Sequence, residues 1–177
     1  EAPGHYPLYR KPGAAFTNPA TEQLAYTDAA PYSVKHALRD DANGDTSSTA
    51  TYLDAWTFYD GLGQVLQTQA EGATGSQSMV VSQQANALGA VIGATPPYIG
   101  TTPGVYQPFN WTTPPQPVTR TVYDSLGRVM QVTQPDGSVV KTFYHGRRTA
   151  TLDALGHQAV REVDAFGRLS RSQQFAG

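Results

Sequence analysis

Short runs of mixed apolar and polar residues, each closed by turn residues, follow one another along the C-terminal third of this chain. Runs that are rich in Val, Thr and Tyr and bounded by Gly, Asp or Ser are typical of β-strands. The predicted strands are Thr119–Tyr123, Arg128–Gln134, Ser138–Tyr144, Arg147–Leu152, His157–Val163 and Arg168–Phe175. We expect them to form one continuous antiparallel meander over residues 119–177.

Earlier hairpins are predicted in residues 51–92. The first joins Ala55–Asp60 to Gln64–Ala70, and a second occupies residues 78–92 around Asn86. Taken alone, Gln83–Val91 also fits a helix. Its place in a series of similar turns favours a hairpin instead.

One turn phrase recurs through these hairpins: an aromatic or aliphatic residue, then Asp, two further residues, and Gly. The copies are residues 59–63, 123–127, 152–156 and 163–167, with a weaker copy at 85–89 in which Asn86 replaces Asp. A repeated turn phrase indicates a repeated supersecondary unit. Such a unit cannot bury its apolar side alone, so neighbouring units must stack.

The residue types of the phrase have a physical reason. An Asp carboxylate accepts a backbone N–H about two residues later, and Gly adopts the left-handed conformation that reverses the chain. A Pro-Asp-Gly sequence at residues 135–137 is a further turn signal. The residues expected to shape the repeat turns are Tyr59, Asp60, Gly63, Asn86, Gly89, Tyr123, Asp124, Gly127, Asp136, Gly137, Asp153, Gly156, Asp164 and Gly167.

Other side chains of each turn are expected to contribute to packing. The residue before Asp and the residue before Gly should fill the core around the turn. The residues before Gly are Leu62, Leu126, Leu155 and Phe166. Arg128 and Arg168 follow Gly, and we expect them to lie over a neighbouring Tyr ring or to pair with the Asp of an adjacent unit.

Proline defines two further segments. Residues 1–50 read as an extended Pro- and Tyr-rich arm with one or two short strands, a candidate donor strand for a neighbouring copy. A short, uncapped helix is conceivable within it over Ser33–Arg39. Residues 93–118 read as a long Pro- and Thr-rich loop, which Tyr98, Tyr106, Phe109 and Trp111 should hold against the fold.

Composition agrees with an all-β fold, an antiparallel meander or β-sheet spiral, because charged residues are only 15% while the chain has 17 Gly, 13 Pro and 10 Tyr. A net charge of −2 gives no face for nucleic acid. No apolar run is long enough for membrane insertion, and the absence of Cys excludes a disulfide framework. Low charge with many Tyr, Thr and Gly favours a secreted, extracellular or cell-surface protein.

Charge is unevenly distributed. No Lys or Arg occurs from Asp40 to Thr119, whereas residues 120–177 hold eight basic and five acidic residues. This asymmetry is either a chance property of solvated surfaces or a means of head-to-tail attraction between copies.

Candidate ligand sites are few. Asp41, Asn43 and Asp45 alternate like calcium ligands, but the segment lacks the Gly and the final acid of a calcium loop, which favours a plain polar turn. Asn110 begins a glycosylation sequon. Trp56 and Trp111 are candidate platforms for cell-surface glycans.

No catalytic or cofactor motif is present. The four His residues have no metal-like spacing, and no nucleophile elbow, phosphate loop or dinucleotide fingerprint occurs. Asp153 and Asp164 could be imagined as a glycosidase pair, but both stand in repeat turns, where capping explains them. We therefore predict no cofactor and no enzyme activity.

With these residues in view, the chain resembles the Rhs/YD-repeat family, whose signature is Tyr-Asp-x-x-Gly-Arg-Leu followed by a Pro-Asp-Gly turn. The nearest match is Arg120–Tyr144, and residues 55–177 carry the resemblance. It implies a β-sheet spiral of the kind that forms hollow shells in the B and C components of insecticidal toxin complexes, in polymorphic toxins and in teneurins. Two departures are the length, too short to close a shell, and the lack of Asp-Pro-x-Gly stretches.

Three functions are consistent with these features. The main hypothesis is a non-catalytic extracellular structural protein that assembles with copies of itself into a filament, through sheet edges and the N-terminal arm. The alternative is a fragment of a larger Rhs-type toxin or adhesin shell. The third is a glycan-binding surface module.

Overall fold

The computed structural model describes residues 21–40 and 52–177, and these residues form thirteen strands and no helix. The predicted all-β, antiparallel fold class is therefore confirmed. The candidate calcium residues Asp41, Asn43 and Asp45, and the first part of the predicted arm, lie outside the described residues. None of the described segments is a helix that could cross a membrane.

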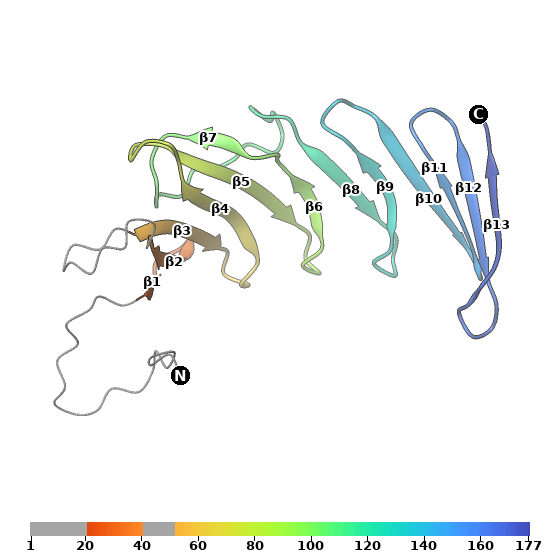
Figure 1. The fold of residues 1–177 in the computed structure, drawn as a ribbon, viewed down its shortest axis with the longest axis horizontal. Coiled ribbons are helices and arrows are strands. Elements are labelled where there is room, and N and C mark those ends of the chain that lie inside the picture. The colour runs from red at the N-terminus through yellow and green to blue at the C-terminus, as the bar shows by residue number, and fades with distance from the viewer. Residues whose placement is uncertain (1–20, 41–51) are drawn as a thin grey trace, which may run out of the picture. The chain divides into compact units, whose positions relative to one another are not determined.

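The strands divide between two compact units. In the first unit, β1 (Glu22–Thr27), β2 (Tyr32–Arg39) and β3 (Tyr52–Tyr59) pair antiparallel in chain order, followed by β4 (Val65–Glu71) (Figure 1). The helix considered over Ser33–Arg39 is wrong. His36 is paired with Leu24 on one side and with Ala55 on the other, so two ladders of backbone hydrogen bonds hold this segment extended.

The interior of the first unit contains unusually many polar groups. Phe58, Val80 and Ala37 are buried, but so are Gln67 and Gln69, which are 0% and 2% exposed. The Gln69 amide donates to Gln67 Oε1 at 2.9 Å and to the Val105 carbonyl at 2.7 Å. Its Oε1 accepts the Gly104 N–H at 2.9 Å. One buried side chain therefore holds part of the 93–118 loop on β4.

Aromatic rings strengthen the same attachment. The Tyr106 ring lies 5.7 Å from that of Phe58. Trp56 lies so close to Gly104 that a Cβ at this position would meet the indole Nε1 at 2.9 Å. The loop therefore folds against β3 and β4 through ring packing as well as hydrogen bonds.

The second unit holds β6, β8 to β13 and residues 81–85 of β5. The strand order from β5 onward is β5-β6-β8-β9-β10-β11-β12-β13, and β7 pairs with β5. The bounds are β5 (Ser78–Ala85), β6 (Val91–Ala94), β7 (Tyr98–Gly100), β8 (Thr119–Tyr123), β9 (Val129–Thr133), β10 (Val139–His145), β11 (Arg148–Leu152), β12 (Gln158–Val163) and β13 (Leu169–Phe175). Residues 119–177 are the continuous antiparallel meander that was predicted.

An aromatic cluster covers part of β5 and β6. The Phe109 ring lies 4.6 Å from Trp111 and 6.2 Å from Tyr98, whose hydroxyl reaches Ser82 Oγ at 2.9 Å. A Cβ at Gly93 would meet the Trp111 ring at 2.8 Å. Glycine at this position of β6 therefore lets the indole lie directly on the strand.

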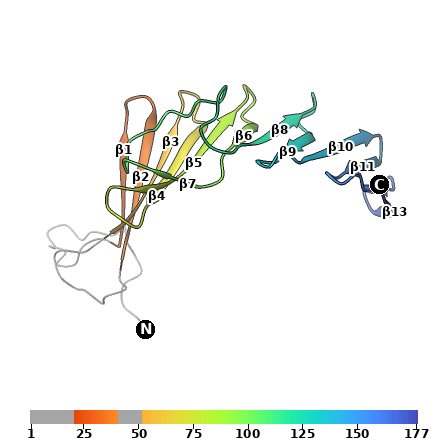
Figure 2. The same cartoon turned by 90° about the horizontal axis from the view of Figure 1, so that it is seen from above.

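The strands β8–β13 form a single layer (Figure 2). None of residues 101–177 is buried, and the side chains of both faces remain at least partly exposed. Because this layer has no second sheet against it among the described residues, backbone ladders and turns supply much of its local order. The turns are therefore the candidate sites of this part of the fold.

Candidate functional site: the Asp-anchored turns

Five turns share one geometry, and we call them the Asp-anchored turns. In each, the side-chain Oδ1 of Asp or Asn accepts the backbone N–H two residues later. The distance is 2.8 Å at Asp60 and 2.9 Å at Asn86, Asp124, Asp153 and Asp164. This is the Asx hydrogen bond, which fixes the first half of the turn without strand pairing.

Glycine completes each of these turns. Its N–H donates to the carbonyl of the Asp or Asn three residues before, at 2.9 to 3.2 Å. All five glycines have a positive φ, between 76° and 86°: Gly63, Gly89, Gly127, Gly156 and Gly167. A side chain with a Cβ is strained in this conformation, which explains the residue type.

A second pair of bonds closes the turns at Asn86, Asp124, Asp153 and Asp164. Oδ1 also accepts the N–H four residues later, at 2.8 to 3.0 Å, in the turns of Asn86, Asp124, Asp153 and Asp164. In the same turns the backbone N–H of the Asp or Asn donates to the carbonyl four residues later, at 2.8 to 3.0 Å. One side-chain oxygen of Asp or Asn thus satisfies two backbone donors that the turn would otherwise leave to solvent.

The other carboxylate oxygen binds a basic side chain of the same turn, Arg at two of the turns and His at a third. Arg128 Nε donates to Asp124 Oδ2 at 2.7 Å, and Arg168 Nε to Asp164 Oδ2 at 2.7 Å. His157 Nδ1 lies 2.9 Å from Asp153 Oδ2. Arg128 and Arg168 therefore each pair with the Asp of their own turn, and the expected pairing with the Asp of an adjacent unit is wrong.

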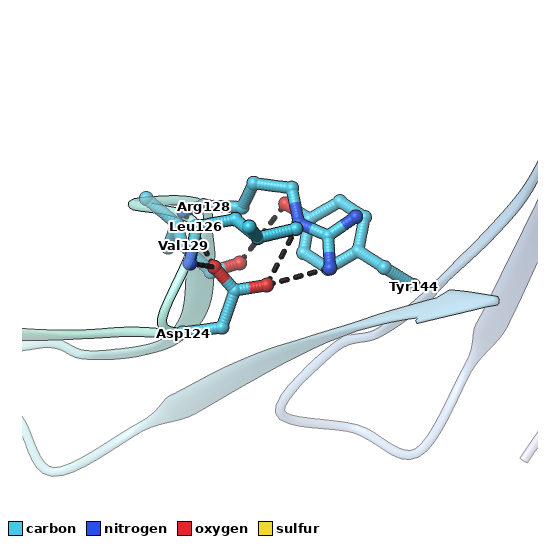
Figure 3. A network of polar contacts seen from close by, with 5 residues as sticks. All are labelled: Asp124, Leu126, Arg128, Val129 and Tyr144. Atoms are coloured by element: carbon cyan, nitrogen blue, oxygen red, sulfur yellow. Dashed lines mark hydrogen bonds and ion pairs between the residues drawn. The ribbon is translucent and has the colours of Figure 1, made fainter. Parts of the chain in front are cut away.

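The turn at Asp124 is also joined to the following strands (Figure 3). The Arg128 guanidinium lies over the Tyr144 ring of β10, 4.2 Å from its centroid. The Tyr144 hydroxyl donates to the Val129 carbonyl at 3.0 Å. Arg168 instead lies over Phe166 of its own turn, 5.2 Å from the ring centroid. Stacking on a neighbouring Tyr therefore occurs in one of the two predicted cases.

The Pro-Asp-Gly turn differs in register. Asp136 stands one residue before Gly137, whose φ is 84°. Its Oδ1 accepts the Ser138 N–H at 2.9 Å, while Gln134 supplies the carbonyl that binds the Gly137 N–H at 2.9 Å. The carboxylate therefore caps the exit of this hairpin rather than its entry.

The residues before the turn glycines do not enter the core, so that expectation is wrong. Leu62, Leu126, Leu155 and Phe166 are 78%, 74%, 79% and 84% exposed. They stand at the second position after Asp, where the turn projects the side chain away from both strands. By contrast the residues before Asp, which belong to the ladders, are half-buried.

Hydrogen bonds lower the pKa of four turn carboxylates: Asp124, Asp136, Asp153 and Asp164. The backbone N–H of Arg128 is the first cause at Asp124, and that of Arg168 at Asp164. At Asp136 the Ser138 side chain leads. Desolvation raises the pKa of Asp153, but the bonds from His157 and Leu155 outweigh it and leave the pKa lowered.

These lowered pKa values give stability a definite dependence on pH. A carboxyl whose pKa is lower in the folded state stabilises the fold above its unfolded pKa, and this contribution is lost as the pH falls through the folded pKa. The urea midpoint should therefore be flat from neutrality to about pH 5 and should fall below about pH 4. A variant with Asn at positions 124, 136, 153 and 164 should show a shallower fall. An equal fall in both proteins would contradict this role.

Two substitutions of Asp124 distinguish the contribution of its hydrogen bonds to stability from the contribution of its charge. Asp124→Ala loses the acceptor of the Leu126 and Arg128 N–H groups and should lower the urea midpoint clearly. Asp124→Asn keeps an acceptor oxygen, as Asn86 does in its own turn, and should lower the midpoint less. Equal losses in the two variants would show that the ion pair with Arg128, not the backbone capping, is what matters.

The remaining candidate residues lie apart from these turns. Asn110 is exposed, and its Oδ1 accepts the Thr112 and Thr113 N–H groups at 3.0 and 3.1 Å. Trp56 and Trp111 are half-buried and pack on Gly104 and Gly93. Packing therefore accounts for both indoles without a ligand. The described residues include no cluster of three His, Cys, Asp or Glu that could hold a metal ion.

Sequence reasoning missed the buried pair Gln67 and Gln69. Only their alternation on one face of a strand hinted at burial, and polar residues in such positions usually indicate the solvent side. The contact of Tyr144 with Arg128 was also missed as a specific pair, because it joins a turn to a strand 16 residues later in the chain.

The fold and its turns define a class: an all-β protein built from serial Asp-anchored hairpins. Residues 123–158 match the family described as RHS Repeat, so the predicted Rhs/YD-repeat resemblance is confirmed. The match begins at Tyr123 and ends in β12, and it therefore includes the turns of Asp124, Asp136 and Asp153. No curated protein matches the chain.

Solved structures that are similar to this chain include the following two. The crystal structure of TcdB2-TccC3 matches with a TM-score of 0.68 and 16% identity, over 90% of this chain and 10% of that chain. The crystal structure of TcdB2-TccC3-Cdc42 matches with a TM-score of 0.63 and 16% identity, over 82% of this chain and 8% of that chain. The likeness shows a shared fold, and this chain spans about a tenth of the length of the chain that it matches.

Proposed function

We propose that this chain is a segment of the wall of a larger Rhs-type β-sheet shell. The observation that carries the proposal is the match of 90% of this chain to 10% of a far longer one. A fold that corresponds to a tenth of a long chain fits one part of a wall rather than a complete shell. The role is structural and non-catalytic, in a secreted toxin-like or adhesin-like assembly.

Local geometry supports the same function. In the second unit each hairpin pairs with its neighbour in chain order, so further hairpins extend the sheet without any change of topology. The Asp-anchored turns close each hairpin with contacts that are mostly internal to the turn. A wall built in this way gains length by adding copies of one unit, and its partners are the neighbouring parts of the same shell.

These observations favour the shell segment over the self-assembling filament, which was the main expectation from the sequence. The two solved chains described above are about ten times longer than this one, which is expected for a segment of a shell. Glycan binding by Trp56 and Trp111 has no supporting observation, because both rings take part in internal packing.

A transplant tests the proposal. The stretch of the TcdB2-TccC3 chain that aligns with this protein is replaced by residues 21–177, and the product is examined by electron microscopy. The proposal predicts closed, monodisperse particles. A matched control carries Val at Gly127, Gly156 and Gly167, where a positive φ is required, and should fail to close.

The isolated chain gives the complementary test. Negative-stain images and light scattering should show soluble particles without fibres. Regular fibres from the purified chain, together with failure of the transplant, would overturn the wall segment and restore the filament hypothesis.

A further inference from the structure

The two faces of the β10–β13 sheet differ in chemistry. Residues opposite each other in a ladder lie on the same face, so the registers define rows across the strands. On one face, which we call the basic face, the rows are Lys141-Leu152-Gln158-Phe175, Phe143-Ala150-Val160-Gln173 and His145-Arg148-Glu162-Arg171. An apolar middle row therefore lies between two rows that carry cations.

The opposite face is nearly neutral and rich in hydroxyl groups. Its rows are Thr142-Thr151-Ala159-Gln174 and Tyr144-Thr149-Arg161-Ser172. Arg161 is its single charged residue in these rows. Successive residues of a strand point to opposite sides of the sheet. Most charged residues of these strands stand at alternate positions, so they lie on the same face.

The cations of the basic face are not neutralised by the acids nearby. Glu162 is the single acid in the three rows of the basic face, and its Oε2 lies 3.4 Å from Arg148 Nη2. Lys141 and Arg171 are exposed and have no ion-pair partner within residues 21–40 and 52–177. The turn acids Asp124 and Asp164 are each held by an Arg of their own turn, and Asp153 is held by His157.

Large apolar side chains accompany these cations. Phe143 is 50% exposed and Phe175 is 47% exposed, although both stand within strands. No described segment covers them, and β9–β13 appear as one layer (Figure 2). Exposed aromatic rings flanked by unpaired cations indicate a surface for a ligand that offers both apolar groups and negative charge.

The molecule shows what kind of ligand this face accepts. Gly93 is opposite Arg120, Arg120 is opposite Thr133, and Thr133 is opposite Val139, so the basic face continues to β6. There it is covered by an irregular stretch of the chain itself. The Trp111 ring lies on Gly93, and Arg120 Nη2 donates to the Trp111 carbonyl at 2.8 Å. An irregular polypeptide with an aromatic side chain therefore already packs on this face.

We propose that the basic face of β10–β13 binds an extended polypeptide segment that carries aromatic and acidic side chains. Apolar side chains of the segment pack on the middle row at Phe143, Ala150 and Val160. Its carboxylates pair with Lys141 on one side and with Arg171 on the other. The inference goes beyond the wall segment proposed above and does not depend on it, because it concerns the face of a single chain.

Fluorescence anisotropy with the full chain tests this surface. The probe is a short labelled peptide of alternating Glu and Phe, measured at low and high salt. We expect saturable binding that weakens with salt. A peptide of alternating Lys and Phe should not bind, and single-stranded oligothymidylate should bind more weakly than the acidic probe.

Matched variants locate the binding. Lys141→Glu and Phe143→Ser should each weaken binding by about tenfold, as expected for residues central to an interface. Arg161→Glu makes the same charge change as Lys141→Glu on the opposite face and should weaken binding less than about twofold. Circular dichroism verifies that each variant keeps its strand content.

Several results would overturn the proposal. Absence of binding by the acidic probe at low salt would exclude this ligand class. Equal losses in Lys141→Glu and Arg161→Glu would reduce the effect to net charge. Tighter binding of oligothymidylate would assign the face to nucleic acid instead.

Discussion

Replacing Gln69 by Leu will lower the free energy of unfolding of the first unit by about 3 kcal/mol, although Leu has a similar size and greater hydrophobicity. Gln69 is 2% exposed, and its amide bonds to Gln67 Oε1, to the Val105 carbonyl and to the Gly104 N–H. Leu leaves these partners in a dry interior with fewer bonds than before. The loss of hydrogen bonds outweighs the gain from an apolar side chain.

Urea unfolding with a local probe measures this effect. Trp56 lies beside Gly104 in the same unit, and Trp111→Phe makes it the single Trp of the chain. Gln174→Leu is the matched control, because Gln174 is exposed on β13, and it should change stability by less than about 0.5 kcal/mol. A loss below about 1 kcal/mol for Gln69→Leu would mean that the loop at residues 104–105 is held by ring packing alone.

Gly127→Val will destabilise the second unit by about 2 kcal/mol. Gly127 has a φ of 76°, and nothing lies within 4 Å of the position that a Cβ would occupy. The cost is therefore backbone strain rather than a steric clash with a neighbour. A β-branched residue resists the left-handed conformation most strongly, so the turn at Asp124 must distort or open.

The control for this substitution stands in the turn at Asp60. Gly61→Val also places a Cβ in open space, but Gly61 is not among the glycines with positive φ. It should cost less than about 0.5 kcal/mol in urea unfolding. Equal costs at the two positions would show that the positive φ of Gly127 is not the reason why Gly127→Val destabilises the protein.

Much of the fold was predictable because the turns are encoded locally. An Asp or Asn followed by Gly three residues later carries its own hydrogen-bond acceptor and its own left-handed residue, so no distant contact is needed to place the reversal. The predicted strands between residues 119 and 177 accordingly agree with β8–β13 to within one residue at each end. The segment Ser33–Arg39 was ambiguous because its strand depends on two partner strands.

The errors concern side chains whose environment is set at a distance. Leu126 and Phe166 were expected in a core, but the tip of a turn has no neighbouring layer to receive them. Gln69 was not expected to be buried, because its partners are loop groups 35 and 36 residues later in the sequence. The amino-acid composition shows how hydrophobic a segment is. It does not show which distant backbone carbonyl will accept a hydrogen bond from a buried amide.

Cross-strand disulfide trapping tests the central claim most directly: serial Asp-anchored turns fix successive hairpins in one antiparallel register. The chain has no Cys, so a disulfide can form only between the two Cys residues that are introduced.

Thr151 and Ala159 are opposite each other across β11 and β12. The double substitution Thr151→Cys with Ala159→Cys should lose its free thiols on mild oxidation. Thr151→Cys with Val160→Cys should keep them, because a shift of one residue places the two side chains on opposite faces. Efficient crosslinking of the second pair and not of the first would contradict the register and, with it, the fold.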